Sequence, residues 1–279
     1  MPFRVAPLDD AVAAVMAAAA RVGSADFGAT GGAGGTRTGE TRARGAVSGG
    51  SAAGDRNRGI PVHFANAYTV ALADADPGYA ALFSAADAAV FTDGMPVAWA
   101  GRRFYPDLAQ EWQRVYGPDV MTGVFEASNQ AGPGGPRHYL LGGSEEVLGQ
   151  LRAAIGRRWP QAVIAGAESP PYRPLSPDER AAQDQRIRES GAQVVWVGLG
   201  TPKQDWEVAR LAAELPVVAM AVGAAFDFLA GVKPQAPVWM QRSGLEWAYR
   251  LGTEPRRLAR RYLWGNPRFV VSAWRSRPR

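Results

Sequence analysis

The chain has no cysteine and only two histidines, His63 and His138, among its 279 residues. Without cysteine it can form neither disulfide bonds nor thiolate metal sites. So few histidines argue against a histidine-based metal centre or a Ser-His-Asp triad. Long apolar runs are also missing, since the longest fall well short of the roughly 20 residues that span a bilayer. These absences favour a cytoplasmic protein whose chemistry depends on other side chains.

The N-terminal part of the chain divides into two segments of different composition. Residues 1–22 are rich in alanine, but charged side chains within the first ten residues are inconsistent with a signal peptide. We therefore predict an N-terminal helix over residues 9–21. Residues 23–59 are mostly Gly, Ala, Ser, Thr and Arg. Such a segment buries too little apolar surface to offset its ordering entropy, so we predict a disordered insertion.

The net charge of +5 is concentrated at the C-terminus. Residues 242–279 contain ten arginines and two acidic residues, a net charge of +8, which leaves the rest of the chain near −3. Arginine mixed with aromatic rings suits an anionic membrane surface, and it also suits RNA or single-stranded DNA. The alternative is that the rings pack on the main domain while the arginines face solvent. The aromatic residues concerned are Trp239, Trp247, Tyr249, Tyr262, Trp264, Phe269 and Trp274.

From residue 60 onward, short apolar runs alternate with segments of helical periodicity. This alternation is typical of parallel βαβ units in a doubly wound sheet. We predict a Rossmann-like α/β domain over residues 60–234, followed by a basic, aromatic and helical appendage over residues 235–279. The predicted strands are 60–64, 88–91, 138–141, 163–165, 194–197 and 217–222, and the predicted helices are 67–75, 77–86, 95–101, 115–130, 145–159, 177–190 and 203–214.

Polar residues follow several of the predicted strands. Asn66 follows the first strand, the turn Thr92-Asp93-Gly94 follows the second, and Gly223 to Asp227 follow the last. Parallel strands of an open α/β sheet place ligands at their carboxyl ends, so these residues are candidates for a binding cleft. The alternative is that Asn66, Asp93 and Asp227 only form turns or cap helices.

The most specific pattern is the run VGLGTPKQDWE between a predicted strand and a predicted helix. Gly198 and Gly200 allow a tight turn and close approach of the backbone to a ligand. Pro202 suits the first turn of a helix, whose free N–H groups favour an anion such as a diphosphate. Lys203 and Gln204 add one charged and one neutral polar group. A Gly-x-Gly turn alone is also common as a plain strand-to-helix connection.

The sequence lacks two motifs, one typical of dinucleotide-binding oxidoreductases and one that would bind a metal ion. No Gly-x-Gly-x-x-Gly turn follows an N-terminal strand with an acidic residue at the ribose spacing, which argues against a Rossmann oxidoreductase. No Asp-x-Asp motif follows a strand, because Asp74-Ala75-Asp76 lies at the end of a predicted helix. We therefore expect no metal and no cofactor, with arginines and helix N-termini binding any diphosphate.

Several of these motifs occur in an order that resembles a known family. Over about residues 60–270 the chain is similar to the WecG/TagA/CpsF family of bacterial glycosyltransferases. The motifs are Asn66, Thr92-Asp93-Gly94, Gln113 to Asp119, VGLGTPKQDWE, Gly223 to Asp227, and LEWAYRLGTEPRR with Arg260-Arg261.

The resemblance implies an inverting, metal-independent transfer from a UDP-sugar, usually of the N-acetylmannosamine type, to a sugar on a polyprenyl diphosphate. It also implies a location on the inner face of the cell membrane and a role in cell-surface polysaccharide synthesis. Asp93 matches the family's proposed catalytic base. Self-association into a homo-oligomer stays open. The candidate substrate-binding residues are Asn66, Thr92, Arg114, Gly198, Gly200, Pro202, Lys203, Gln204, Gly223 and Asp227, and those for a diphosphate or membrane are Arg250, Arg257, Arg260 and Arg261.

The chain departs from the family pattern at several places. Phe64 stands where many members have a pocket threonine, Gln235 replaces a common arginine, and residues 168–172 replace a His-Gly-Tyr segment. The insertion at 23–59 is not a family feature. A non-catalytic nucleotide- or RNA-binding module that uses the basic tail is the main alternative function.

Overall fold

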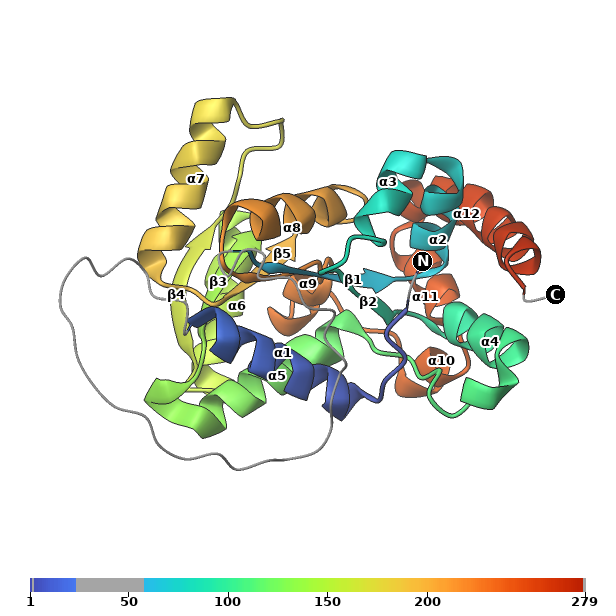
Figure 1. Cartoon of the computed structure of the whole chain (residues 1–279), viewed down its shortest axis with the longest axis horizontal. Coiled ribbons are helices and arrows are strands. Elements are labelled where there is room, and N and C mark those ends of the chain that lie inside the picture. The colour runs from blue at the N-terminus through green and yellow to red at the C-terminus, as the bar shows by residue number, and fades with distance from the viewer. Residues whose placement is uncertain (2, 24–57, 278–279) are drawn as a thin grey trace.

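The computed structural model describes residues 1, 3–23 and 58–277. The predicted N-terminal helix is present as α1, Leu8–Gly23. The predicted insertion at 23–59 lies almost entirely outside the described residues. The described chain forms a central sheet with helices around it (Figure 1).

The sheet has six strands, all parallel, in the order β2-β1-β6-β5-β3-β4. This arrangement confirms the predicted α/β class. Each predicted strand is present, with its ends moved by a few residues. The strands are β1 Ile60–Ala65, β2 Ala89–Thr92, β3 Arg137–Gly142, β4 Val163–Glu168, β5 Val194–Gly198 and β6 Val218–Met220.

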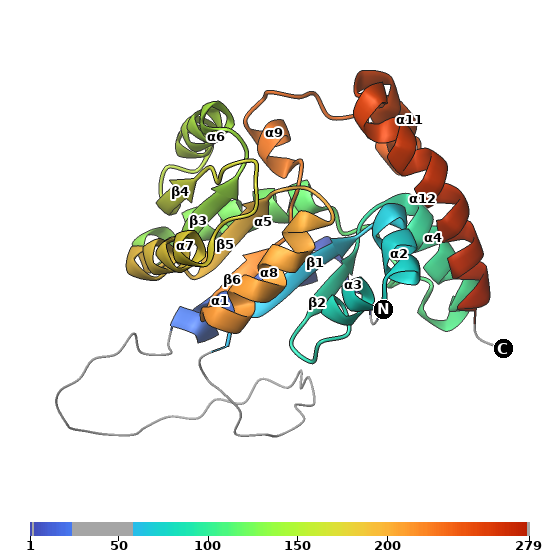
Figure 2. The ribbon, with the colours of Figure 1, turned by 90° about the horizontal axis from the view of Figure 1, so that it is seen from above.

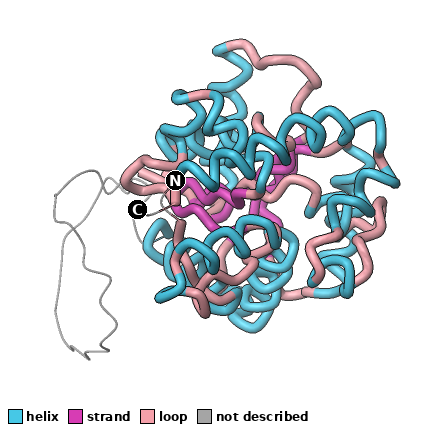
Figure 3. The backbone as a smooth tube through the Cα atoms, turned by 90° about the vertical axis from the view of Figure 1, so that its right-hand side faces the viewer, coloured by secondary structure: helices cyan, strands magenta, loops and turns pink. Residues whose placement is uncertain are grey.

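Helices cover both faces of the sheet because successive strand residues point to opposite sides. On one face, Trp196 and Val218 belong to a core with α1, α5 (Gly117–Ala131) and α6 (Glu145–Arg158). On the other face, Val195 and Val197 belong to a core with α7 (Pro177–Ser190) and α8 (Lys203–Glu214). Figure 3 shows the strands at the centre of the molecule with helices around them. The fold is therefore doubly wound.

Local capping explains where several helices begin. Ser176 and Glu179 form a reciprocal capping box at α7, as their spacing predicts. Asp76 caps α3, Pro77–Leu82. That helix ends before the predicted residue 86 because the amides of Phe83 and Ser84 bond three residues back instead of four. The other helices are α2 Ala67–Ala75, α4 Met95–Phe104, α9 Ala225–Leu229, α10 Val238–Arg242, α11 Glu246–Thr253 and α12 Pro255–Arg275.

Helices α10, α11 and α12 make up the described part of the C-terminal appendage, residues 235–277. Helix α12 runs alongside α2 at one edge of the molecule (Figure 2). A side chain at Gly265 would meet the Tyr68 ring at 2.9 Å, so the two helices approach closely there. Arg268 also donates to Asp74 at 2.9 Å. The appendage is thus packed onto the main domain at the carboxyl edge of β1.

Candidate functional site

The first two strands bring Asn66 and Asp93 together. Ala65 pairs with Thr92 in the sheet. The residues that follow them, Asn66 and Asp93, therefore lie next to each other at the carboxyl edge. The Asn66 amide donates to the Asp93 carboxylate at 3.4 Å. Asn66 also caps α2 by accepting from the backbone amides of Tyr68 and Thr69. Its helix-capping role and its place beside Asp93 therefore both hold.

Asp93 lies half-buried in a mixed electrostatic field. Burial raises the pKa of its carboxyl group to about 6, and Glu246 acts in the same direction. Arg114, Asn66 and Arg250 oppose that rise in pKa. A carboxyl group with a pKa near 6 is ionised at neutral pH and still basic enough to accept a proton, which suits a general base.

A small pocket opens beside Asp93 between the ends of β5 and β6. We call it the glycine-lined pocket, because Gly200 and Gly223 form its wall, and its volume is about 70 Å³. Both glycines have positive φ, +77° and +57°, which side chains rarely adopt. The Gln204 side chain joins the two loops, accepting from the Gly200 amide at 3.1 Å and donating to the Ala221 carbonyl at 3.0 Å. Gln204 therefore fixes the shape of this pocket.

Three arginines of the appendage close the glycine-lined pocket. Arg250 lies on α11, and Arg257 and Arg261 lie on α12. Arg261 donates to Asn66 Oδ1 at 3.3 Å and stacks 4.6 Å from the Tyr68 ring centre. Burial lowers its pKa, and its buried Nε has no hydrogen-bond partner among the residues that the structure describes. Arginine side chains and the backbone turn at a helix N-terminus are groups that attract an anion, so this pocket is a candidate for a diphosphate.

A second, more apolar cavity of about 290 Å³ adjoins the first, and we call it the appendage pocket. Its walls come from the start of α4 and from the appendage. The two pockets share Asn66, Asp93, Tyr116, Arg250 and Arg261. The Asp93 carboxylate therefore lies where the two pockets meet. The apolar residues of the appendage pocket include Met95, Trp247, Tyr262, Phe269 and Val270.

An ion pair connects the main domain to the appendage beside Asp93. Arg114 Nη2 donates to Glu246 Oε2 at 2.6 Å, and the Tyr116 hydroxyl donates to Glu246 Oε1 at 2.9 Å. Burial raises the pKa of Tyr116, which keeps the phenol protonated as a donor. Sequence reasoning assigned no role to Tyr116 or Glu246. The available signal was that Glu246 is one of only two acids in the basic tail.

The structure shows the surroundings of four further residues that the sequence analysis named. The Thr92 side chain is buried, and its hydroxyl has no partner among the described residues. Gly198 lies against the Phe226 ring, which a side chain there would meet at 2.7 Å. Pro202 immediately precedes the first residue of α8. Phe64, the departure from the family's threonine, lines the glycine-lined pocket.

Three other predicted residues lie away from the two pockets. Lys203 and Arg260 are exposed and line neither one. Asp227 forms an ion pair with Lys233 at 2.6 Å, and Lys233 in turn contacts Glu254 at 3.1 Å. Within residues 1, 3–23 and 58–277, no group of three or more His, Asp or Glu side chains could hold a metal ion. The expectation of a metal-independent reaction stays a prediction.

This arrangement defines a doubly wound α/β protein with an arginine-lined cleft at the carboxyl edge of its sheet. A family model described as the glycosyl transferase WecG/TagA/CpsF family matches residues 35–279. Because the match covers most of the chain, the protein belongs to this family. It is a glycosyltransferase, an enzyme that moves a sugar from a donor to an acceptor.

Proposed function

We propose that the enzyme moves an N-acetylmannosamine-type sugar, with inversion, from a UDP-sugar to a sugar on a polyprenyl diphosphate during cell-surface polysaccharide synthesis. The observation that carries this proposal is the position of Asp93 where the two pockets meet. The glycine-lined pocket offers arginines and backbone turns to the UDP diphosphate. The appendage pocket offers apolar and aromatic walls to the acceptor.

The proposed chemistry is a single displacement. The Asp93 carboxylate takes the proton of the acceptor hydroxyl as its oxygen forms a bond to the anomeric carbon of the donor sugar. The bond from that carbon to the diphosphate oxygen breaks, and UDP leaves with the electron pair. Attack from the face opposite the leaving group inverts the anomeric configuration.

The leaving diphosphate gains negative charge in this step, and the appendage supplies the compensating positive charge. Arg250, Arg257 and Arg261 line the same pocket as the glycine turns. Fixed cations of this kind stabilise a developing anion because they need little reorganisation during the reaction. Glu254, which pairs with Arg257, holds one of these cations at the start of α12.

The exposed face of α12 supports a peripheral position on the membrane. Leu263, Val270 and Trp274 are 78%, 64% and 60% exposed, and their spacing of seven and four residues places them on one helix face. No helix in the described ranges is long and apolar enough to cross a membrane. An amphipathic, basic helix with such a face suits insertion at the head-group level.

A radiochemical assay tests the proposal. The purified enzyme is incubated with a panel of UDP-sugars and a prenyl-diphosphate-linked N-acetylhexosamine, and lipid-extractable label is counted. We expect label from a UDP-N-acetylmannosamine-type donor, and NMR of the product should show the anomeric configuration opposite to that of the donor. Retention of configuration would contradict the single displacement.

The competing function is a nucleotide- or RNA-binding module. It rests on exposed ring–arginine pairs such as Arg277 over Trp274, at 4.0 Å from the ring centre. Such a module would hold RNA at moderate salt and consume no UDP-sugar. The same preparation can be tested for both properties.

A further inference from the structure

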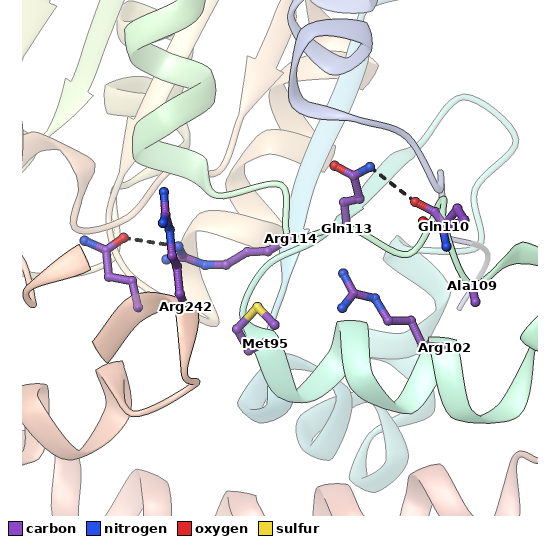
Figure 4. A pocket seen from close by; sticks show the side chains of 8 residues that line it. Met95, Arg102, Ala109, Gln110, Gln113, Arg114 and Arg242 are labelled. Atoms are coloured by element: carbon purple, nitrogen blue, oxygen red, sulfur yellow. Dashed lines mark hydrogen bonds between the residues drawn. The ribbon is translucent and has the colours of Figure 1, made fainter. Parts of the chain in front are cut away.

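A third depression lies next to the appendage pocket and has no part in the mechanism above. We call it the cationic pocket. It lies between α4, residues 109–114 and α10, and its volume is about 590 Å³ (Figure 4). Apart from Met95 and Ala109, its lining consists of three guanidinium and three carboxamide side chains, with no carboxylate among them. These six residues are Arg102, Arg114, Arg242, Gln110, Gln113 and Gln241.

Two of the three guanidinium groups have free donors. Arg242 is exposed and makes no hydrogen bond or ion pair with any residue that the structure describes. Arg102 donates through Nε to the Trp112 carbonyl at 2.8 Å, and its terminal nitrogens have no partner in the described chain. Only Arg114 is neutralised, by Glu246. The cationic pocket therefore carries positive charge that nothing in the described protein compensates.

The cationic pocket is joined to the reaction centre. Met95 follows Asp93 by two residues and lines both the cationic pocket and the appendage pocket. Gln241 also lines both, and it accepts a hydrogen bond from Arg114 at 3.2 Å. A ligand whose reacting hydroxyl lies at Asp93 can thus extend from the appendage pocket into the cationic pocket.

The proposed reaction brings two diphosphates to one active site, one on the donor and one on the acceptor. Like charges repel, so each needs its own cations. The donor diphosphate takes the cluster of Arg250, Arg257 and Arg261 at the glycine turns. The appendage pocket lies between that cluster and the cationic pocket, since it shares lining residues with each. Two cation clusters on either side of the reacting sugars match the two diphosphates of the substrates.

Two exposed tryptophans lie on the helices that line the cationic pocket, Trp99 on α4 and Trp239 on α10. Trp99 lies on the same face of α4 as Met95 and Arg102, and it packs on Gly244, where a side chain would meet its ring at 2.4 Å. Trp99 is 46% exposed, and Trp239 on α10 is 63% exposed. Aromatic residues around a basic site favour the boundary between lipid tails and head groups, where a prenyl diphosphate has its charge.

We propose that the cationic pocket binds the diphosphate of the lipid-linked acceptor. Guanidinium groups bind phosphate oxygens in pairs of parallel hydrogen bonds, and the three carboxamides can donate to the remaining oxygens. The proposal rests on the proposed function, because it assigns the acceptor's charged group to a site next to Asp93.

The test compares Arg242→Glu with Arg103→Glu. Arg103 is also exposed and lies next to Arg102 on α4, but it does not line the pocket. Both variants change the net charge equally, so general attraction to an anionic membrane falls equally in both. We expect Arg242→Glu to raise the KM for a prenyl-diphosphate-sugar acceptor by at least about tenfold, because a charge-assisted contact becomes repulsive. Its kcat and its affinity for UDP should stay near those of the Arg103→Glu control.

Two further measurements distinguish binding of the acceptor's diphosphate from other causes of a higher KM. For an alkyl glycoside acceptor without diphosphate, the two variants should have the same KM. If Arg242→Glu raises the KM for this acceptor as much as for the diphosphate acceptor, the proposal is overturned. Calorimetric titration with geranyl diphosphate, which needs no turnover, should show weaker binding only for Arg242→Glu. If that binding is unchanged while binding to phosphatidylglycerol vesicles falls, the pocket is a lipid head-group site and the proposal is wrong. Failure of the proposed sugar transfer would leave the titration result intact.

Discussion

Arg114 and Glu246 form an ion pair of 2.6 Å between residues 132 positions apart in the chain. The pair joins the segment before α5 to α11, and both side chains are near enough to Asp93 to act on its charge. Arg114 opposes the rise in the pKa of Asp93, whereas Glu246 adds to it. The ion pair therefore connects the appendage to the main domain and also sets the basicity of the proposed catalytic base.

We expect substitutions of the pair to move the pH profile in opposite directions. Glu246→Gln removes a negative charge, so the pKa of Asp93 should fall and the acid limb of kcat/KM should move to lower pH. Arg114→Gln removes a positive charge, and the acid limb should move to higher pH. Profiles of kcat/KM for the two variants check this expectation. Shifts in the same direction would mean that another group controls the acid limb.

The raised pKa of Asp93 also predicts a stability effect. In the folded protein the pKa is about 6, whereas that of an unperturbed aspartate is 3.8. The folded state therefore holds this proton more tightly, and the free energy of unfolding falls as pH rises from about 4 to about 6. Asp93→Asn should remove the penalty and stabilise the protein at pH of about 7.5 by up to about 3 kcal/mol.

Urea unfolding of the wild type and of Asp93→Asn at several pH values checks this effect. The difference should disappear below about pH 3, where the wild-type carboxyl group is protonated in both states. Asp107→Asn, at an exposed position, serves as the control and should change little. A variant that is no more stable than the wild type at neutral pH would show that Asp93 carries no desolvation penalty.

Much of the fold followed from local signals. Glycine, proline and capping residues mark where strands and helices end, so the alternation of elements was predictable. Asn66 and Asp93 were predictable as neighbours, because parallel strands end at one edge of the sheet. The partners of charged side chains were not predictable. For Asp227 the sequence suggested a ligand contact or a helix cap, and the structure adds an ion pair with Lys233 that no local pattern indicated.

A buried network at the start of α8 should be essential for stability. Asp205 accepts from the Tyr79 hydroxyl at 2.7 Å and lies 3.0 Å from His63 Nδ1. Asp205→Ala leaves both groups buried without this partner, which should cost about 2–4 kcal/mol. Because Gln204 is the preceding residue, the variant should also bind UDP more weakly.

Glu207→Ala is the matched control in the same helix. Glu207 pairs with Arg210 nearer the surface, so its loss should cost only about 1 kcal/mol. Thermal unfolding and UDP titration of both variants check the expectation. Equal losses in the two variants would contradict a special role for the buried network.

The exposed face of α12 should control membrane binding without affecting the chemistry. Leu263→Glu with Trp274→Glu places two negative charges on this face, and neither residue lines the appendage pocket, so sedimentation with anionic vesicles should fall at least about tenfold. Turnover of a soluble acceptor should stay near the wild-type rate. The control is Arg256→Glu with Arg275→Glu, which lowers the net charge by more than the apolar double variant does. It therefore tests the effect of charge alone. If that control loses vesicle binding to the same extent, the apolar face has no separate contribution.

The appendage shows where sequence reasoning reaches its limit. Arg257, Arg260 and Arg261 lie within about one helical turn, and the sequence marks none of them as different. In the structure Arg261 lines the glycine-lined pocket from a half-buried position and Arg257 lines it from an exposed one, whereas Arg260 lines neither pocket. Tyr68 and Gly265 set the packing of α12 on α2 from positions 197 residues apart. Such a long-range contact leaves no local pattern.

The most direct test of the central claim is the turnover of Asp93→Asn with saturating UDP-sugar and prenyl-diphosphate-sugar acceptor. The side chains are nearly equal in size, so calorimetry should show unchanged affinity for UDP. Transfer should fall by at least about 10²-fold, because the general base is lost. Transfer at close to the wild-type rate, with UDP still bound, would contradict the assignment of Asp93 as the base.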